Sequence, residues 1–147
     1  MALRRDHRRP QTRTLRLYVD ASALVKLLIV EPETVEVAGW WNEADEVLSA
    51  GVAYVESRAA IARRLSGQVA VDARRELEKL WDALEVVAVD DQLIESAARV
   101  ADVHRLRALD ALHLAAAQLL VVHGLVFCCW DRELRRAARN TGFATAP

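Results

Sequence analysis

Four carboxylates in this chain stand where they could act together on a phosphate ester. Asp20 follows the apolar run LRLYV, Asp131 follows LVFCCW, Asp110 opens ALHLAAAQLL, and Glu56 lies inside a helical pattern. Around one point, each pair of such charges would cost about 3–4 kcal/mol at roughly 4–5 Å and an effective dielectric near 20. Such a cluster needs protons or divalent cations, and Mg²⁺ and Mn²⁺ favour oxygen ligands and keep bound water. The predicted chemistry is attack of a metal-activated water on a phosphodiester.

Each aspartate also has a structural interpretation. Asp20, Asp110 and Asp131 all precede a predicted helix, where an N-cap carboxylate accepts backbone N–H bonds and complements the helix dipole. Arg107 and Arg135 are candidate ion-pair partners of Asp110 and Asp131 respectively, by helical spacing.

Glu56 has no such interpretation, because its helical neighbours at i±3 and i±4 are all valine or alanine. A charge on that apolar face needs a cationic partner, and a metal ion is one candidate. His113 lies three residues after Asp110, on the same side of its helix. We interpret His113 as a structural residue rather than a ligand, because imidazole suits transition metals better than Mg²⁺.

Short apolar strands alternate with helices along the chain. Strands are expected near residues 15–19, 47–50, 86–89 and 125–129, with an edge strand at 142–145. Helices are expected over residues 21–29, 33–44, 52–65 (closed by Gly67), 71–84, 91–103, 111–122 and 133–139. This alternation predicts a parallel sheet with helical crossovers, in which ligands bind beyond the carboxyl ends of the strands.

The composition is that of a single globular domain: 147 residues, 53 % of them apolar and 28 % charged. The adjacent cysteines, Cys128 and Cys129, suit neither a disulfide framework nor a zinc site, so a reducing cytoplasm is the expected compartment. Residues 111–130 lack charged side chains, but their histidines, Gln118 and Gly124 argue against a membrane helix.

The charge is unevenly distributed along the chain. Residues 1–16 hold six arginines and one aspartate, a balance of +5, whereas the remaining 131 residues hold 14 basic and 20 acidic residues, a balance of −6. Residues 1–14 have no apolar pattern, which predicts a disordered basic arm before one folded domain over residues 15–147. The arm is interpreted as a solvated tail, with phosphate binding as the alternative.

Four segments, each with one of the acids, resemble the motifs of PIN-domain nucleases in order and spacing: LYVDASALVKL, AYVESRAAIARR, LRALDALHLAAA and LVFCCWDRELRRAA. The resemblance extends from Leu15 to the C-terminus and is greatest to the VapC toxins. It implies a PIN-like three-layer α/β sandwich, in which a small central parallel sheet is flanked by helices.

The resemblance also implies an activity. The chain would be a Mg²⁺-dependent endoribonuclease, with Mn²⁺ able to substitute, and the toxin of a VapBC-type pair held inactive by a cognate VapB-like antitoxin. RNA would be the substrate and a homodimer the assembly. Asp20, Glu56, Asp110 and Asp131 would be the catalytic, metal-binding acids, and Ser22 would hydrogen-bond a carboxylate or a bound water.

One position departs from the family pattern, which often has Thr or Ser two residues before the last acid. This chain has Cys129 there, a weaker hydrogen-bonding group. Two other functions stay open: a housekeeping RNA-processing nuclease and a PIN-like module that binds RNA or protein without cleavage. The presence of all four acids argues against the non-cleaving module, and the small size favours a toxin over a housekeeping nuclease.

Overall fold

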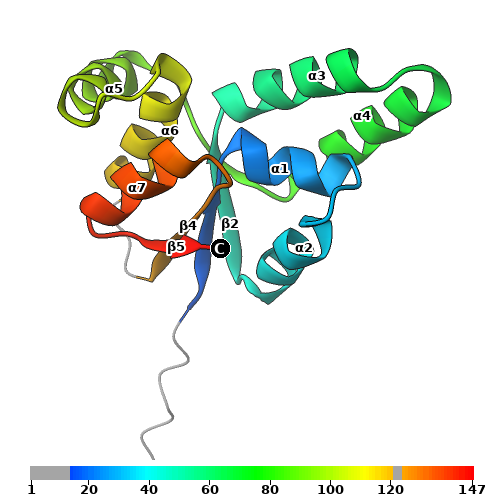
Figure 1. Ribbon diagram of the computed structural model, residues 1–147, viewed down its shortest axis with the longest axis horizontal. Coiled ribbons are helices and arrows are strands. Elements are labelled where there is room, and N and C mark those ends of the chain that lie inside the picture. Colours follow the sequence, from blue (N-terminus) through cyan, green and yellow to red (C-terminus); the bar gives the residue numbers. More distant parts are fainter. Residues whose placement is uncertain (1–13, 121–123) are drawn as a thin grey trace, which may run out of the picture.

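The computed structural model describes residues 14–120 and 124–147, so the predicted arm lies outside the described residues except for Thr14. Five parallel strands form one sheet in the order β3-β2-β1-β4-β5. Helices cover both faces of this sheet (Figure 1), which confirms the predicted three-layer α/β class. In chain order the elements are β1 (Arg16–Val19), α1 (Ala21–Leu28), α2 (Thr34–Glu43), β2 (Glu46–Ala50), α3 (Val52–Arg64), α4 (Gly67–Asp82), β3 (Glu85–Val87), α5 (Asp91–His104), α6 (Ala108–Leu119), β4 (Leu125–Cys128), α7 (Arg132–Asn140) and β5 (Ala144–Ala146).

Strand β1 lies in the middle of the sheet, between β2 and β4. Val19 is in register with Cys128, so the chain leaves β1 and β4 at neighbouring points of one sheet edge. The sequence order of the strands reverses between β1 and β4, and such a reversal opens a crevice at the carboxyl ends of a parallel sheet. Asp20 and Asp131 follow these two strands and therefore come to the same crevice.

The two faces of the sheet pack into separate cores because successive strand residues point to opposite sides. Tyr18, Phe127 and Cys129 belong to the core beneath α5, α6 and α7. Leu17 and Cys128 belong to the core on the other face, beneath α1 and α2. The two cysteines face opposite sides, as the strand alternation predicts.

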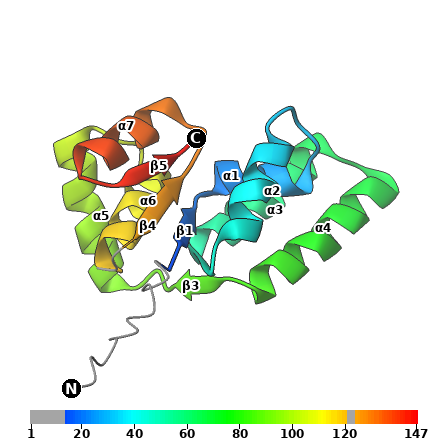
Figure 2. The same ribbon diagram turned by 90° about the horizontal axis from the view of Figure 1, so that it is seen from below.

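Helices α3 and α4 form an antiparallel pair beside α1, and α4 runs outward from the sheet in Figure 2. Two predicted boundaries here were wrong. Helix α3 ends at Arg64, and Gly67 is the first residue of α4, with φ +58°, rather than the residue that closes α3. Helix α4 begins before residue 71 because Ala70 packs into the apolar cluster shared by α1, α3 and α4.

The uncharged stretch of residues 111–130 contributes to two elements, α6 and β4, rather than to one span. Helix α6 begins at Ala108, three residues before its predicted start, because the Ala111 N–H already donates to the Arg107 carbonyl at 2.9 Å. Within residues 14–120 and 124–147, no helix has the length and apolar character required to cross a bilayer.

Candidate active site

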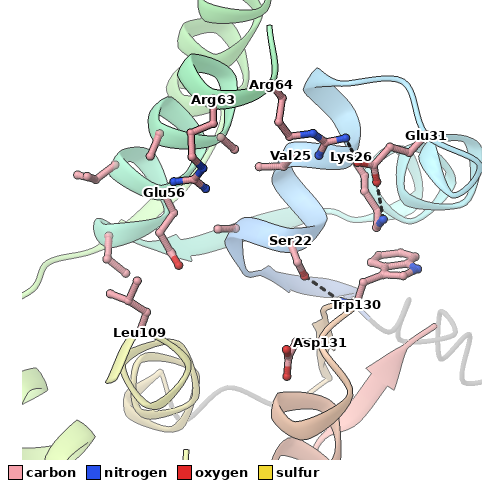
Figure 3. A pocket seen from close by; sticks show the side chains of 15 residues that line it. Ser22, Val25, Lys26, Glu31, Glu56, Arg63, Arg64, Leu109, Trp130 and Asp131 are labelled. Atoms are coloured by element: carbon pink, nitrogen blue, oxygen red, sulfur yellow. Dashed lines mark hydrogen bonds and ion pairs between the residues drawn. The ribbon is translucent and has the colours of Figure 1, made fainter. Parts of the chain in front are cut away.

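A cleft of about 630 Å³ opens at the carboxyl edge of the sheet, between α1, α3 and the turn after β4. In Figure 3, Ser22, Glu56 and Asp131 lie around it from these three elements, with Leu109 of α6 beside them. The lining is mixed, with aliphatic side chains from α1 and α3 and charged groups at both ends. Such a surface suits a ligand that has both apolar and charged parts.

Asp20 lies at the inner end of this site and is 4 % exposed. It is the N-cap of α1: its Oδ1 accepts from the Ala23 N–H at 3.0 Å and from the Ser22 hydroxyl at 2.7 Å. Ser22 Oγ in turn accepts from the Trp130 N–H at 2.9 Å, which ties Asp20 to the loop before Asp131. The N-cap role and a place among the site's acids are therefore compatible for Asp20.

Burial is the largest cause that raises the pKa of Asp20, to about 6, and the negative charge of Glu56 acts in the same direction. His113 and the two hydrogen bonds oppose this shift without cancelling it. A cation near Asp20 would relieve the cost of this buried charge.

Glu56 on α3 contacts a histidine from another helix. The Nε2 atom of His113 on α6 lies 2.7 Å from Glu56 Oε2, and the Tyr18 hydroxyl of β1 lies 2.9 Å from His113 Nδ1. Tyr18 and His113 are both buried. This row of three side chains satisfies both ring nitrogens, in agreement with the interpretation of His113 as a structural residue.

Asp110 and Asp131 share one cation. Arg107 Nε lies 3.5 Å from Asp110 Oδ2, and Arg107 Nη2 lies 3.4 Å from Asp131 Oδ2. The pKa of Asp110 is raised, first by burial and then by the charge of Asp131, while Arg107 opposes the shift. Arg107 is 82 % exposed, so this contact is a weak one.

The predicted N-cap role is confirmed for Asp131 but was wrong for Asp110. Asp131 is the N-cap of α7, and its Oδ1 accepts from the Leu134 N–H at 2.9 Å. Asp110 is not a cap, because α6 begins two residues before it. The predicted Asp131–Arg135 pair was wrong as well: Arg135 donates to the Cys129 carbonyl, at 2.9 and 3.3 Å.

Cys129 occupies the position where the family pattern has a hydroxyl residue. Its Sγ lies 3.7 Å from the Asp131 carbonyl oxygen, so the thiol contacts the backbone of the site loop. Burial raises the pKa of this thiol, and it raises that of Cys128 to about 12. Both cysteines are therefore protonated at neutral pH.

The side chains of the site differ from a closed metal centre. Among the residues that the structure describes, no three His, Cys, Asp or Glu side chains form a ready-made metal cluster. The Arg107 guanidinium nevertheless shows that a cation is accommodated between Asp110 and Asp131. Carboxylates that approach from several elements, with water and phosphate oxygens completing the shell, are a donor set that Mg²⁺ accepts.

Sequence reasoning identified two partners of these acids, Arg107 for Asp110 and Ser22 for Asp20, but it missed the others. The residue that contacts Glu56 lies on another helix, because the contact with His113 joins residues that are 57 positions apart. The Asp110-x-x-His113 spacing did place His113 on the side of the acids. No sequence signal pointed to Tyr18 or to the Arg107–Asp131 contact.

The chain is similar to known proteins over most of its length. Residues 17–140 match the family model described as PIN domain. Ribonuclease VapC45 of Mycobacterium tuberculosis is 38 % identical over 136 residues, which cover 89 % of this chain and 94 % of that protein.

Two solved structures have the same fold. The M. tuberculosis toxin VapC20, described as cleaving the sarcin–ricin loop, has a TM-score of 0.69 at 19 % identity, covering 87 % of this chain and 96 % of that one. A toxin–antitoxin complex from Klebsiella pneumoniae has a TM-score of 0.61 at 15 % identity, covering 78 % and 86 % of the two chains.

Proposed function

Because this chain belongs to the PIN-domain family, we propose that it is a metal-dependent endoribonuclease and the toxin of a VapBC-type toxin–antitoxin pair. The observation that carries the proposal is that the four acids, from the β1–α1 turn, α3, α6 and the β4–α7 turn, lie near enough to act on one another: the charge of Glu56 raises the pKa of both Asp20 and Asp110, and the charge of Asp131 raises that of Asp110. The 38 % identity to a named VapC ribonuclease supports RNA as the substrate class. Residues 15–147 would form the nuclease domain.

Asp20, Glu56, Asp110 and Asp131 are the residues that would hold Mg²⁺, for which Mn²⁺ could substitute. When bound, the cation supplies the positive charge that lowers the pKa of a water nucleophile and offsets the charge of the phosphate. The protein's part is to hold the carboxylates at the cleft edge. Ser22 and the Ala23 N–H do so for Asp20, since both donate to the same oxygen.

His113 would be the positioning residue for Glu56. The pKa of Tyr18 is raised well above its usual value, chiefly by burial, so its hydroxyl keeps its proton and can donate to His113 Nδ1. This assignment places the imidazole proton on Nε2, which donates to Glu56 Oε2. One carboxylate oxygen of Glu56 is then fixed, and Oε1 is left for the site.

A cognate VapB-like antitoxin is the proposed protein partner, because a toxin–antitoxin complex shares the fold. The expected assembly of the free toxin is a homodimer. Co-expression with the product of an adjoining small reading frame, followed by light scattering of the purified species, measures both associations.

The test of the proposed function compares wild type with Glu56→Gln on structured RNAs, in Mg²⁺, Mn²⁺ or EDTA, with mapping of the cleaved ends. Wild type should cleave with either metal and not in EDTA. Glu56→Gln should lose at least about 10²-fold in rate, because the reacting groups would be displaced by an ångström or so. Its stability should be close to that of wild type, because the glutamine side-chain oxygen can still accept the hydrogen bond from His113 Nε2.

Glu76→Gln is the matched control, because Glu76 lies on the exposed side of α4 and should leave cleavage unchanged. Cleavage by Glu56→Gln within threefold of wild type would remove Glu56 from the site. RNA binding by wild type without any cleavage would favour a non-cleaving module. Cleavage of the organism's precursor RNAs at processing sites, with no effect on growth, would favour the housekeeping nuclease.

A further inference from the structure

Helix α7 carries four arginines and one glutamate in nine residues. Its buried positions are Leu134, Ala137 and Ala138, so the arginines lie on the remaining surface. Arg132, Arg136 and Arg139 are exposed, at positions i, i+4 and i+7. This spacing sets them along one side of the helix, immediately after the site residue Asp131.

The concentration of positive charge here contrasts with the rest of the domain. Residues 103–147 hold six basic and three acidic residues, a balance of +3, and two of the three acids belong to the site itself. Residues 17–102 hold eight basic and 17 acidic residues, a balance of −9. By net charge, the C-terminal part of the chain that contains α7 is therefore more favourable to a polyanion than the preceding part of the domain.

Arg105 extends the basic surface beyond α7. One hollow of about 220 Å³ is lined by Asn140 and the four α7 arginines. A second, of about 230 Å³, is lined by Arg105 together with Arg136 and Asn140. Arg105 ends α5 in the left-handed conformation, with φ 55°, where glycine is the usual residue. The Arg105 side chain is exposed and lines this hollow together with Arg136.

Not every arginine on α7 is available to a ligand. Arg135 donates to the Cys129 carbonyl, and Arg139 donates to Thr145 Oγ1 at 2.8 Å, so both help to hold the fold. Arg136 forms only an exposed i,i+3 pair with Glu133, which contributes little. Arg132 forms no hydrogen bond or ion pair within the part of the chain that the structure describes. Arg132 and Arg136 are thus the best placed to contact an anion.

We propose that Arg105, Arg132 and Arg136, the α7 arginine face, bind the phosphate backbone of the RNA substrate beside the acids. The inference rests on the proposed function. A row of guanidinium groups complements regularly spaced phosphates, and Asp131 connects this row to the site without an intervening residue. The substrate would then extend from the cleft across α7, and these contacts would hold it without reading its sequence.

The test measures binding of a short labelled oligouridylate in EDTA, where cleavage does not interfere, over a range of NaCl concentrations. The variant is Arg132→Gln with Arg136→Gln. The control is Arg75→Gln with Lys79→Gln on α4, which also removes two exposed positive charges. The control is closely matched, because Arg75 and Arg136 are 66 % and 61 % exposed and each pairs with an acid at i−3.

Loss of two phosphate contacts should reduce the slope of log Kd against log [NaCl] by about 1.4, at roughly 0.7 per contact on single strands. If the variant and wild type bind equally well near 1 M NaCl, this slope change makes the variant bind roughly 25-fold more weakly than wild type at about 0.1 M NaCl. The control should keep the wild-type slope. Equal slopes for all three proteins, or the same reduction in the control, would overturn the proposal.

This result and the proposed function can fail separately. A wild type that cleaves RNA, combined with unchanged slopes, would refute only the α7 arginine face. A wild type that never cleaves, combined with the expected slope change, would refute the nuclease and leave an RNA-binding surface. Unchanged RNA binding with weaker antitoxin capture by the α7 variant would show a protein-docking surface instead, and would overturn the proposal.

Discussion

Replacing Asp20 by Asn should stabilise the metal-free protein, and the gain should grow with pH. Asp20 is buried, and its pKa is raised from 3.8 to about 6. A raised acid pKa means that protonation stabilises the native state at low pH, and that this stabilisation is lost as the pH rises through about 6. The cost of the ionised carboxylate is therefore about 3 kcal/mol at pH 8 and about 1.5 kcal/mol at pH 5.

Asparagine keeps an oxygen for the Ser22 hydroxyl and the Ala23 N–H, but adds amide donors that cost a fixed amount at any pH. The difference between Asp20→Asn and wild type should consequently change by about 1.5 kcal/mol between pH 5 and pH 8. Urea denaturation in EDTA at several pH values measures this change. Asp90→Asn is the control, because Asp90 is also an N-cap, with Leu93 N–H at 2.9 Å, but is exposed.

Addition of Mg²⁺ or Mn²⁺ should make wild type more stable than Asp20→Asn, the reverse of the order without metal. At about 100 times its Kd, a metal bound only to the native state adds about 2.7 kcal/mol to wild type. Asp20→Asn should lose most of that increment, whereas Asp90→Asn should keep it. A stability difference independent of pH, or an equal gain from metal in wild type and Asp20→Asn, would refute this reasoning.

Three further predictions concern the neighbours of the acids and the N-terminal segment. Tyr18→Phe should lower the free energy of unfolding by about 1–3 kcal/mol, because His113 Nδ1 loses its buried partner, and denaturation with Leu17→Val as a packing control measures it. Arg107→Gln should raise the pKa of Asp110 further, because the opposing charge is removed; an unchanged carboxyl titration by NMR would contradict the contact. Deletion of residues 1–13 should leave the melting temperature and cleavage intact, since the segment has no apolar pattern, and loss of folding would assign it to the core.

The sequence predicted the layers of the fold because local patterns determine them. The apolar runs of the strands were sufficient to place the parallel sheet, and the N-cap aspartates Asp20 and Asp131 placed the starts of α1 and α7. The boundaries at Gly67 and Ala108 were missed because tertiary burial and backbone bonding, rather than periodicity, set them. Tertiary context commonly overrides local preference in this way.

The sequence identified the acids and two nearby partners, Arg107 for Asp110 and Ser22 for Asp20, but it did not identify the partners that come from other helices. Glu56 and His113 come from different helices, and Arg107 reaches Asp131 across 24 positions. Such contacts depend on how α3, α6 and α7 lie on the sheet, which neither helical spacing nor composition specifies. The charge counts contrasted only residues 1–16 with the rest of the chain, so they did not predict the arginine side of α7, which became visible from the burial of Leu134, Ala137 and Ala138.

The central position of β1 in the sheet affects how the protein folds during its synthesis on the ribosome. Strand β1 pairs with β2 early in the chain, but its other neighbour, β4, does not exist until Leu125–Cys128 have been synthesised. A nascent chain that already carries Asp20, Glu56 and Asp110 would still expose an unpaired edge of β1 and lack Asp131. Long-range pairing of this kind folds late. Translation itself would therefore keep the site unassembled until the chain is nearly complete, and no N-terminal fragment left by a stalled ribosome would carry it.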